Sequence, residues 1–292
     1  MPTLNHTVIM SSARYLDNEQ PINPYYTADA IDTSVAQAEH DAIRTALTEA
    51  GVRVYQVDAP TTSQDGVYTA NWALIRGETA VLARLPQARQ SEEDWAEQVL
   101  RERGLTVHRV PDEWRFSGQG DALPCGRYLF CGSGYRSDER AQAFAADILG
   151  YERVQLQTIP QLDVDGQPVI NRSSGWADSF YYDIDLALAV IRPATSDTKG
   201  LIAYCPAAFT PSSQQRLDVF DGVDKIEVSE HEAQVAFACN LVSTGEVVVM
   251  SAQAPGLKAE LERRGLRVVT PEITQLSKGG GYIRCTTLSL ND

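Results

Sequence analysis

The feature of this sequence that most limits its fold is a unit of helix, strand, loop and hairpin that recurs about five times. In each unit a polar or reactive residue stands at the start of an apolar run, and successive members of this set lie roughly 45 to 65 positions apart. The five members are Asn71, Asp121, Asp185, Asn240 and Cys285. Internal repeats of about this period indicate a propeller or a repeat array. We therefore expect an α/β fold built from similar units.

The ends of the helices and strands are marked by glycines and turns. Amphipathic patterns predict helices over residues 32–50, 91–103, 137–149 and 256–264. A capping box of Ser229 with Glu232 predicts a further helix that ends near Cys239. Hairpin turns are predicted at Arg76-Gly77, Cys125-Gly126 and Thr244-Gly245. The last unit lacks an outer strand, so the segment HTVIMSS is expected to pair with the C-terminal strand and close a ring.

The charge and the apolar pattern limit the partners of the chain. The 292 residues carry a formal net charge of −14, whereas nucleic acids and anionic membranes require a basic face, so neither is expected as a partner. The apolar stretches are far shorter than the roughly 20 residues of a bilayer span, and no secretory signal pattern is visible. The five cysteines lack CxxC spacing, which indicates reduced thiols and no zinc cluster. We expect a cytoplasmic protein with one domain over residues 1–292.

In a ring of similar units the five polar or reactive residues would meet near the central axis. Groups from separated segments that converge in this way usually build an active site. The alternative is that each residue only caps the end of a strand, as polar residues commonly do. Cys285, which follows three glycines in SKGGGYIRC, has two comparable interpretations, a buried core thiol or a nucleophile.

Six segments of the chain carry a resemblance to a known family. They are INPYY, DGVYTANWAL, FSGQGDAL followed by CGSGYRSDERA, YYDIDLALAVI, FACNLV and GGGYIRCTTLSL. Their order and spacing resemble those of the amidinotransferase and dimethylarginine dimethylaminohydrolase superfamily, the penteins, over nearly the whole chain. The resemblance implies a five-bladed α/β-propeller that needs no metal and no organic cofactor.

Two motifs depart from the family pattern. The resemblance implies that Cys285 attacks the central carbon of a guanidinium group, assisted by a histidine in an H-x-D motif and a carboxylate in an E-G-G-D or E-G-x-G-D motif. This chain has DID at 183–185 and SG at 117–118 in those places, although the second acids, Asp185 and Asp121, are kept. The chain thus resembles the family in scaffold and nucleophile but not in the acid/base pair.

Asp183 stands where the family has its histidine, and three interpretations remain open for it. Carboxylates one residue apart on a strand face the same side, so Asp183 and Asp185 would share a proton, with Asp183 acting as an acid. They would equally form a fixed anionic clamp for a cation, or the acid/base function is lost. No histidine occupies a motif position that marks a replacement base, and His40 and His231 are expected in solvent.

Further positions follow from the resemblance. Asp65 in QDGVYTAN matches an acid that holds substrate, and Asn71 matches a family asparagine nearby. Arg136 in GYRSDER matches an arginine that binds the carboxylate of the substrate, a role suited to its fork of donors. A surface arginine before a helix is the other interpretation of Arg136. Ser117 and Asp121 are expected to shape the polar end of the pocket.

The function predicted is hydrolysis of a non-peptide carbon–nitrogen bond in a small guanidino, amidino or ureido compound. Cys285 is expected to form a covalent adduct, while Asp183 and Asp185 orient the cation and move protons. Two alternatives stay open, an inert pentein that binds a cationic metabolite or a protein partner, and an amidinotransferase. The sequence also leaves a homodimer open.

Overall fold

The computed structural model describes residues 4–26 and 29–290, in which the strands form five sheets of three strands each. Every sheet combines one antiparallel and one parallel pair around its middle strand. The sheets are β15 (Leu288–Ser289), β1 (Thr7–Met10) and β2 (Arg53–Gln56); β3 (Ala73–Arg76), β4 (Thr79–Leu82) and β5 (Thr106–Arg109); β6 (Ala122–Cys125), β7 (Tyr128–Ser133) and β8 (Glu152–Gln157); β9 (Leu188–Arg192), β10 (Gly200–Tyr204) and β11 (Val223–Glu227); and β12 (Val242–Ser243), β13 (Val247–Val249) and β14 (Arg267–Val269). The predicted α/β class and the pseudo-fivefold repeat are confirmed.

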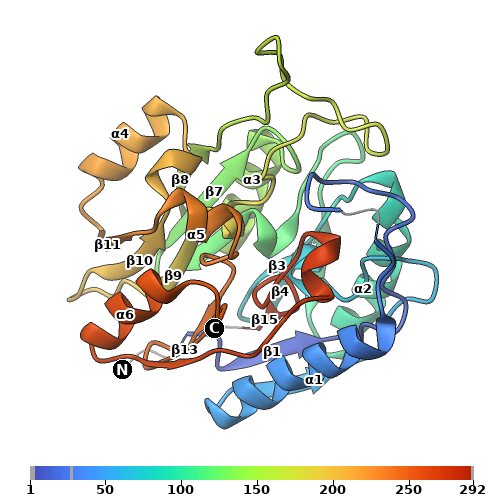
Figure 1. Ribbon diagram of the computed structural model, residues 1–292, viewed down its shortest axis with the longest axis horizontal. Coiled ribbons are helices and arrows are strands. Elements are labelled where there is room, and N and C mark those ends of the chain that lie inside the picture. The colour runs from blue at the N-terminus through green and yellow to red at the C-terminus, as the bar shows by residue number, and fades with distance from the viewer. Residues whose placement is uncertain (1–3, 27–28, 291–292) are drawn as a thin grey trace.

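Helices α1, α2, α4 and α6 lie towards the outside of the view in Figure 1, with strands further in. The helices are α1 (Thr33–Glu49), α2 (Ser91–Glu102), α3 (Glu139–Leu149), α4 (Pro211–Val219), α5 (Glu230–Gln234) and α6 (Pro255–Arg263). Asp32 caps α1 by accepting hydrogen bonds from the backbone N–H groups of Ser34 and Val35. The buried face of α1, including Ile43 and Leu47, belongs to the main hydrophobic core. No helix within the described ranges is long and apolar enough to cross a membrane.

The N-terminal strand pairs with the C-terminal strand, as the sequence predicts. β1 is antiparallel to β15, with Val8 opposite Ser289 and Ile9 opposite Leu288. Its other edge pairs in parallel with β2, where Thr7 lies opposite Arg53. The two ends of the chain therefore share one sheet.

Two helix predictions need correction, and one helix was not predicted. α5 ends at Gln234 rather than near Cys239, and Phe237 has a φ of 52°, a conformation that interrupts a right-handed helix. Ser229 accepts a hydrogen bond from the Glu232 N–H, but the Glu232 carboxylate accepts from the first turn of α6 instead of completing the capping box. α3 begins two residues later than predicted, and α4, which begins at Pro211, was not predicted.

Short 3-10 turns carry two of the five polar or reactive residues of the repeat. Asn71 lies in the turn Thr69–Trp72, and Asp185 lies in the turn Ile184–Leu186, which Asp183 precedes. The prediction that both aspartates lie on a strand is therefore wrong. The Leu186 and Ala187 N–H groups bond back to the carbonyls of residues 183 and 184, so β9 begins only at Leu188.

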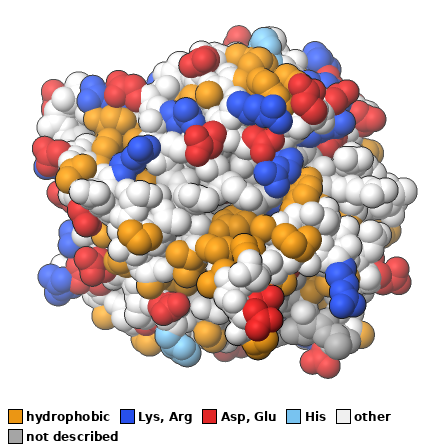
Figure 2. Space-filling model, turned by 90° about the horizontal axis from the view of Figure 1, so that it is seen from above, with side chains coloured by type: hydrophobic (Ala, Val, Ile, Leu, Met, Phe, Trp, Pro, Cys, Tyr) orange, Lys and Arg blue, Asp and Glu red, His pale blue; other side chains and the backbone are white. Residues whose placement is uncertain are grey.

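The surface mixes charges of both signs. Figure 2 shows one face on which Lys and Arg side chains are interspersed with Asp and Glu, while hydrophobic side chains gather near its middle. On that face the excess of acidic residues does not form one continuous patch.

Candidate active site

Cys285 is held by the side-chain amide of Asn240. The Cys285 N–H donates to Asn240 Oδ1 over 3.1 Å, and Asn240 Nδ2 donates to Cys285 Sγ over 3.1 Å. The thiol lies 3.5 Å from Oδ2 of Asp185, to which it donates. Only 2% of the residue is exposed. The thiol is thus aligned with a carboxyl group at the distance of a weak hydrogen bond to sulfur.

The surroundings of Cys285 favour the neutral thiol. Burial, and then the negative charge of Asp185, raise the pKa of Cys285 well above its usual range, whereas the hydrogen bond from Asn240 acts in the opposite direction. Arg284, the residue before Cys285 in the chain, donates to Thr287 O over 2.6 Å and to Gln119 Oε1 over 2.9 Å. A thiolate at this position therefore requires a further positive charge near the carboxyl groups.

The three glycines before Cys285 let the chain pass close to two side chains. A Cβ atom on Gly279 or Gly281 would lie 2.4 Å from the side chain of Tyr68. Gly280 has a φ of +85°, and a Cβ atom there would lie 2.4 Å from Asn23 Oδ1. The glycines therefore serve close packing as well as turn geometry, and they fix the turn that leads to the cysteine.

Asn71, Ser117 and Asp183 form one hydrogen-bonded cluster. Asn71 Nδ2 donates to Asp183 Oδ2 over 2.8 Å and to Ser117 Oγ over 2.9 Å. All three residues are buried. The sequence predicts these positions in one pocket, and the structure brings them together.

Asp121, Asp183 and Asp185 each keep one buried oxygen without a hydrogen-bond partner among the described residues. Asp121 uses its other oxygen to accept the Ile184 N–H over 2.9 Å. Burial raises the pKa of all three carboxyl groups, and the charge of Asp183 raises the pKa of Asp121 and Asp185 further. Because like charges this close oppose one another, the cluster holds protons more tightly than isolated carboxyl groups do and attracts a cation.

Asp65 lies in a separate corner of the site. Its two carboxylate oxygens accept the Tyr26 hydroxyl at 2.7 and 2.8 Å, and Gln64 Nε2 donates to one of them over 3.3 Å. Burial raises the pKa of Asp65 to about 6, although the charge of Arg89 lowers it in part. Asp65 is thus joined to the segment that carries Tyr26 rather than directly to the cysteine.

Arg136 is buried, so the interpretation as a surface arginine is wrong. Its guanidinium lies over the ring of Tyr182, with 4.8 Å between Cζ and the ring centroid, and it donates to the carbonyl of Ile22. The positive charge of Arg136 also lowers the pKa of Asp183. Tyr182 in turn donates to Gly280 O over 2.7 Å, so Tyr182 links Arg136 to the turn before the cysteine.

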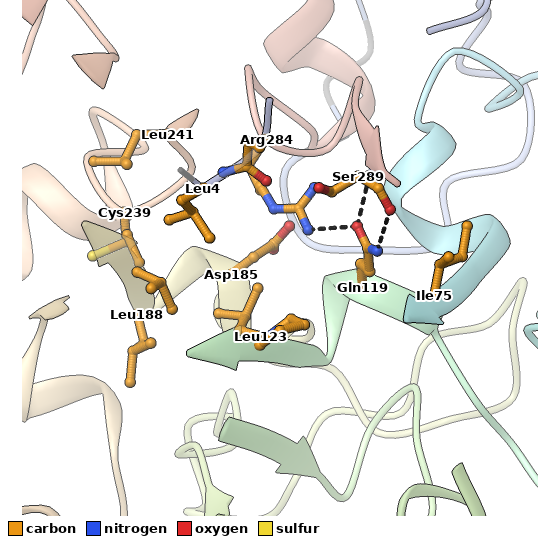
Figure 3. Close-up of a pocket in the computed structure, with 14 residues that line it drawn as sticks. Leu4, Ile75, Gln119, Leu123, Asp185, Leu188, Cys239, Leu241, Arg284 and Ser289 are labelled. Atoms are coloured by element: carbon orange, nitrogen blue, oxygen red, sulfur yellow. Dashed lines mark hydrogen bonds between the residues drawn. The ribbon is translucent and has the colours of Figure 1, made fainter. Parts of the chain in front are cut away.

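A small cavity of about 30 Å³ lies behind Asp185. Figure 3 shows the carboxyl group of Asp185 pointing towards Arg284, and Gln119 bridging Arg284 and Ser289 by hydrogen bonds. The other labelled side chains are mostly apolar: Leu4, Ile75, Leu123, Leu188, Cys239 and Leu241. Asp185 thus lies between the cysteine and this cavity.

One statement about histidine needs correction. His40 was expected in solvent, but it is fully buried on α1, and burial lowers its pKa to about 4. None of the hydrogen bonds made by Cys285, Asp183 or Asp185 to described residues involves a histidine. The described residues also contain no group of three His, Cys, Asp or Glu side chains able to hold a metal ion.

Comparison with known proteins identifies the family. The family described as N,N dimethylarginine dimethylhydrolase, eukaryotic, matches residues 17–170. The N(G),N(G)-dimethylarginine dimethylaminohydrolase of Mycobacterium tuberculosis (strain ATCC 25618 / H37Rv) is 32% identical over 276 residues, covering 92% of this chain and 81% of that protein. The chain belongs to the dimethylarginine dimethylaminohydrolase family.

Further proteins that are similar to this chain bear on its architecture. The bifunctional arginine dihydrolase/ornithine cyclodeaminase ArgZ of Synechocystis sp. (strain ATCC 27184 / PCC 6803 / Kazusa) is 27% identical over 98% of this chain, which spans 38% of that protein. The N-terminal domain of ArgZ bound to substrate superposes with a TM-score of 0.85 at 27% identity, with 98% of each chain covered. A dimethylarginine dimethylaminohydrolase adduct superposes with a TM-score of 0.69 at 18% identity, covering 97% of this chain and 98% of that chain, and shows the shared fold.

Sequence reasoning missed several residues of this family member's site. Arg89 and Glu92 form a buried ion pair beside Asn71, and Tyr26 binds Asp65. Arg89 and Glu92 stand three residues apart, a spacing that is also common on solvent-exposed helices, so the pattern does not indicate burial. Tyr26 was visible within INPYY, but nothing in that motif specified Asp65 as its partner.

Proposed function

We propose that this protein hydrolyses a carbon–nitrogen bond of a small cationic guanidino, amidino or ureido compound through a covalent adduct on Cys285. The observation that carries the proposal is the contact between the Cys285 thiol and Asp185. Next to it stands the carboxyl group of Asp183, whose Oδ1 has no hydrogen-bond partner among the described residues. The relatives support it. One is named a dimethylarginine dimethylaminohydrolase, another an arginine dihydrolase, and a variant ArgZ N-terminal domain has been crystallised covalently bound to a reaction intermediate.

The reaction begins when the cationic substrate reaches the three carboxyl groups. The positive charge of the substrate offsets their repulsion and favours the thiolate, so the Cys285 proton moves to Asp185 Oδ2. The sulfur then bonds to the planar carbon of the substrate. A tetrahedral adduct forms and expels ammonia or an amine, which leaves with a proton from Asp183.

Water completes the turnover. It adds to the adduct carbon as Asp183, which protonated the leaving group, takes back one proton from the water. The carbon–sulfur bond then breaks as the carbonyl group of the product forms, and the second proton of the water passes to solvent. The sulfur regains a proton from Asp185, which restores the thiol. Asn71, Ser117 and Asp121 hold the polar end, while Asp65 and Arg136 bind more distant parts of the substrate.

The proposal extends to the architecture. The five sheets form a closed five-bladed propeller in one domain of residues 1–292, and the pairing of β1 with β15 supports the closure. We place the protein in the cytoplasm.

One observation favours a second function, an inert protein that binds a cationic metabolite. The thiol of Cys285 is buried and has a raised pKa, as expected if no nucleophile is needed. The same three carboxyl groups would then hold the cation without chemistry.

Turnover assays with a panel of guanidino, amidino and ureido compounds decide between the two functions. Ammonia, amine and product masses are followed for the wild type, Cys285→Ala and the control Cys125→Ala, whose thiol is buried next to Arg192 O. Turnover by the wild type and the control, and none by Cys285→Ala, supports the hydrolase. Binding of compounds without turnover by any of the three proteins supports the inert binder.

A further inference from the structure

Arg89 is buried and its three guanidinium nitrogens all donate hydrogen bonds. Nε and Nη2 each donate to Glu92 over 2.8 Å, which gives a bidentate ion pair. Nη2 also donates to the carbonyls of Asp65 and Tyr68. Nη1 donates to Asn71 Oδ1 over 2.8 Å. These contacts hold Arg89 in place from several sides.

The contact with Arg89 determines how the Asn71 amide is oriented. An arginine side chain has donors only, so the atom of Asn71 that faces it must be the carbonyl oxygen. The NH₂ group of Asn71 must then point the other way, where Ser117 Oγ and Asp183 Oδ2 accept from it. A reversed amide would place two donors together at Arg89 and two acceptors together at Asp183.

This orientation makes the two oxygens of Asp183 unequal. Oδ2 accepts the hydrogen bond from Asn71, whereas Oδ1 is buried and has no partner within the described part of the chain. The oxygen bound by the amide is the poorer site for a proton. Oδ1 is therefore the atom that remains for a proton or for a substrate N–H group.

We propose that Arg89 is a positioning residue that locks the Asn71 amide towards Asp183, and so makes Oδ1 of Asp183 the oxygen that exchanges protons with the substrate. The role of Asp183 Oδ1 in catalysis rests on the proposed function. The orientation of the Asn71 amide by Arg89, here called the lock, does not depend on any activity. Glu92 contributes to the same orientation, because its two hydrogen bonds fix the plane of the Arg89 guanidinium. Ser63 and Trp72 in turn donate to Glu92, over 2.5 and 3.0 Å.

Other groups also act on Asp183 and must be held constant in a test. Its pKa is raised by burial and lowered by the charge of Arg136, by hydrogen bonds from Ser117 and Asn71, and by the charge of Arg89. The titratable groups that interact with it are Asp121, Asp185, Tyr182 and Cys285. A test at position 89 must therefore keep the positive charge and change only the geometry of the donors.

Arg89→Lys meets this requirement. A lysine keeps the charge but lacks the planar fork, so it cannot hold Glu92 bidentately and Asn71 at the same time. The Asn71 amide is then free to rotate, and Asp183 loses the hydrogen bond that stabilises its ionised carboxylate. The titration midpoint of Asp183 should rise by about one to two pH units, because a hydrogen bond to a charged group has that strength.

The midpoint is followed by ¹³C NMR of labelled aspartate carboxyl groups, with Asp183→Asn used to assign the signal. The control is Arg101→Lys, an exposed arginine of α2 paired with Glu97, which should shift nothing. Asn71→Leu removes the amide and should raise the midpoint as well. In the Asn71→Leu background, Arg89→Lys should add no further shift, which a merely structural role of Arg89 does not predict.

The alkaline limb of the pH profile of kcat/KM gives the second readout, because Asp183 must hold a proton to release the amine, and this limb should move with the NMR midpoint. If the wild type turns over no compound, the proposed function fails, but the NMR titration still tests the lock. If Arg89→Lys does not fold, Glu92→Gln, which removes the carboxylate that holds the Arg89 guanidinium bidentately, replaces it in the same comparison with and without Asn71. An unchanged Asp183 midpoint in the folded variants, or equal shifts from Arg89→Lys with and without Asn71, overturns the inference.

Discussion

The Asp65 corner of the site and its Asp183 centre are both built around a buried aspartate, but the two carboxyl groups are partnered differently. Both oxygens of Asp65 accept hydrogen bonds from Tyr26. Asp183 has one oxygen bound to Asn71 and one without a partner among the residues described. Arg89 touches both regions, through the Asp65 carbonyl and through the Asn71 amide.

The charges around the two aspartates differ as well. The carboxylate near Asp65 is Glu92, which is neutralised by its ion pair with Arg89. The carboxyl groups near Asp183 are Asp121 and Asp185, and neither forms an ion pair within the described residues. A fully bonded carboxyl group holds structure, whereas one with a free oxygen and like-charged neighbours is available for protons and cations. We therefore expect Asp183 to control chemistry and Asp65 to control binding and stability.

The largest effect is expected for Asp183→Asn. An amide cannot exchange protons, so kcat should fall by about 10²–10⁴-fold, the usual contribution of a general acid or base. Asp65→Asn should leave kcat within about tenfold of the wild type and act mainly on KM. Steady-state kinetics of the two variants under one set of conditions makes the measurement. A larger loss of kcat for Asp65→Asn would reverse the assignment of the two regions.

The second effect is a pH dependence of stability at Asp65. Its pKa rises from 3.8 to about 6 on folding, so the native state binds more protons than the unfolded state between these values. The free energy of unfolding should therefore fall as the pH rises through this window, by about 3 kcal/mol, and be constant above it. Asp65→Asn should remove this contribution. Urea denaturation of the wild type and Asp65→Asn between about pH 4 and 7 tests this. The difference between their free energies of unfolding at each pH isolates the contribution of Asp65.

The sequence predicted the elements of the fold better than the arrangement of the site. Glycines such as Gly51, Gly104 and Gly150 marked the helix ends because a positive φ after a helix favours glycine, and each has one. The partner strand of the C-terminus was predictable because an incomplete unit requires one. Both signals are local or follow from the repeat.

The conformation, burial and partners of the site residues could not be predicted from the residues next to them in the sequence. Asp183 and Asp185 were expected on a strand, but backbone hydrogen bonds at Leu186 and Ala187 form a 3-10 turn there. His40 lies among charged residues in the sequence and is nevertheless buried, because the helix turns that side towards the core. The ion pair of Arg89 with Glu92 becomes meaningful only when Asn71 is seen between it and Asp183.

A smaller effect is expected for Tyr26→Phe. The change leaves a buried carboxyl group without the hydroxyl that both its oxygens accept, so the protein should lose about 1–3 kcal/mol of stability. It should also raise the pKa of Asp65, because a donor to the charged form is removed. Urea denaturation at pH 7 and at pH 5 measures both consequences. Tyr15→Phe, on the same N-terminal segment, serves as the control, and an equal loss in both variants would show that Asp65 does not depend on Tyr26.

The smallest effect is expected for Ser117→Ala, which tests how far Asp183 depends on its neighbours. Asn71 Nδ2 would lose Ser117 Oγ but keep Asp183 Oδ2 and the Ser117 carbonyl as acceptors. Stability should therefore fall by only about 0.5–1.5 kcal/mol, the net value of one hydrogen bond. Because Ser117 lowers the pKa of Asp183, the alkaline limb of kcat/KM should move slightly upwards and by less than in Arg89→Lys. A shift as large as that of Arg89→Lys would mean that Ser117, and not the locked amide, sets the protonation of Asp183.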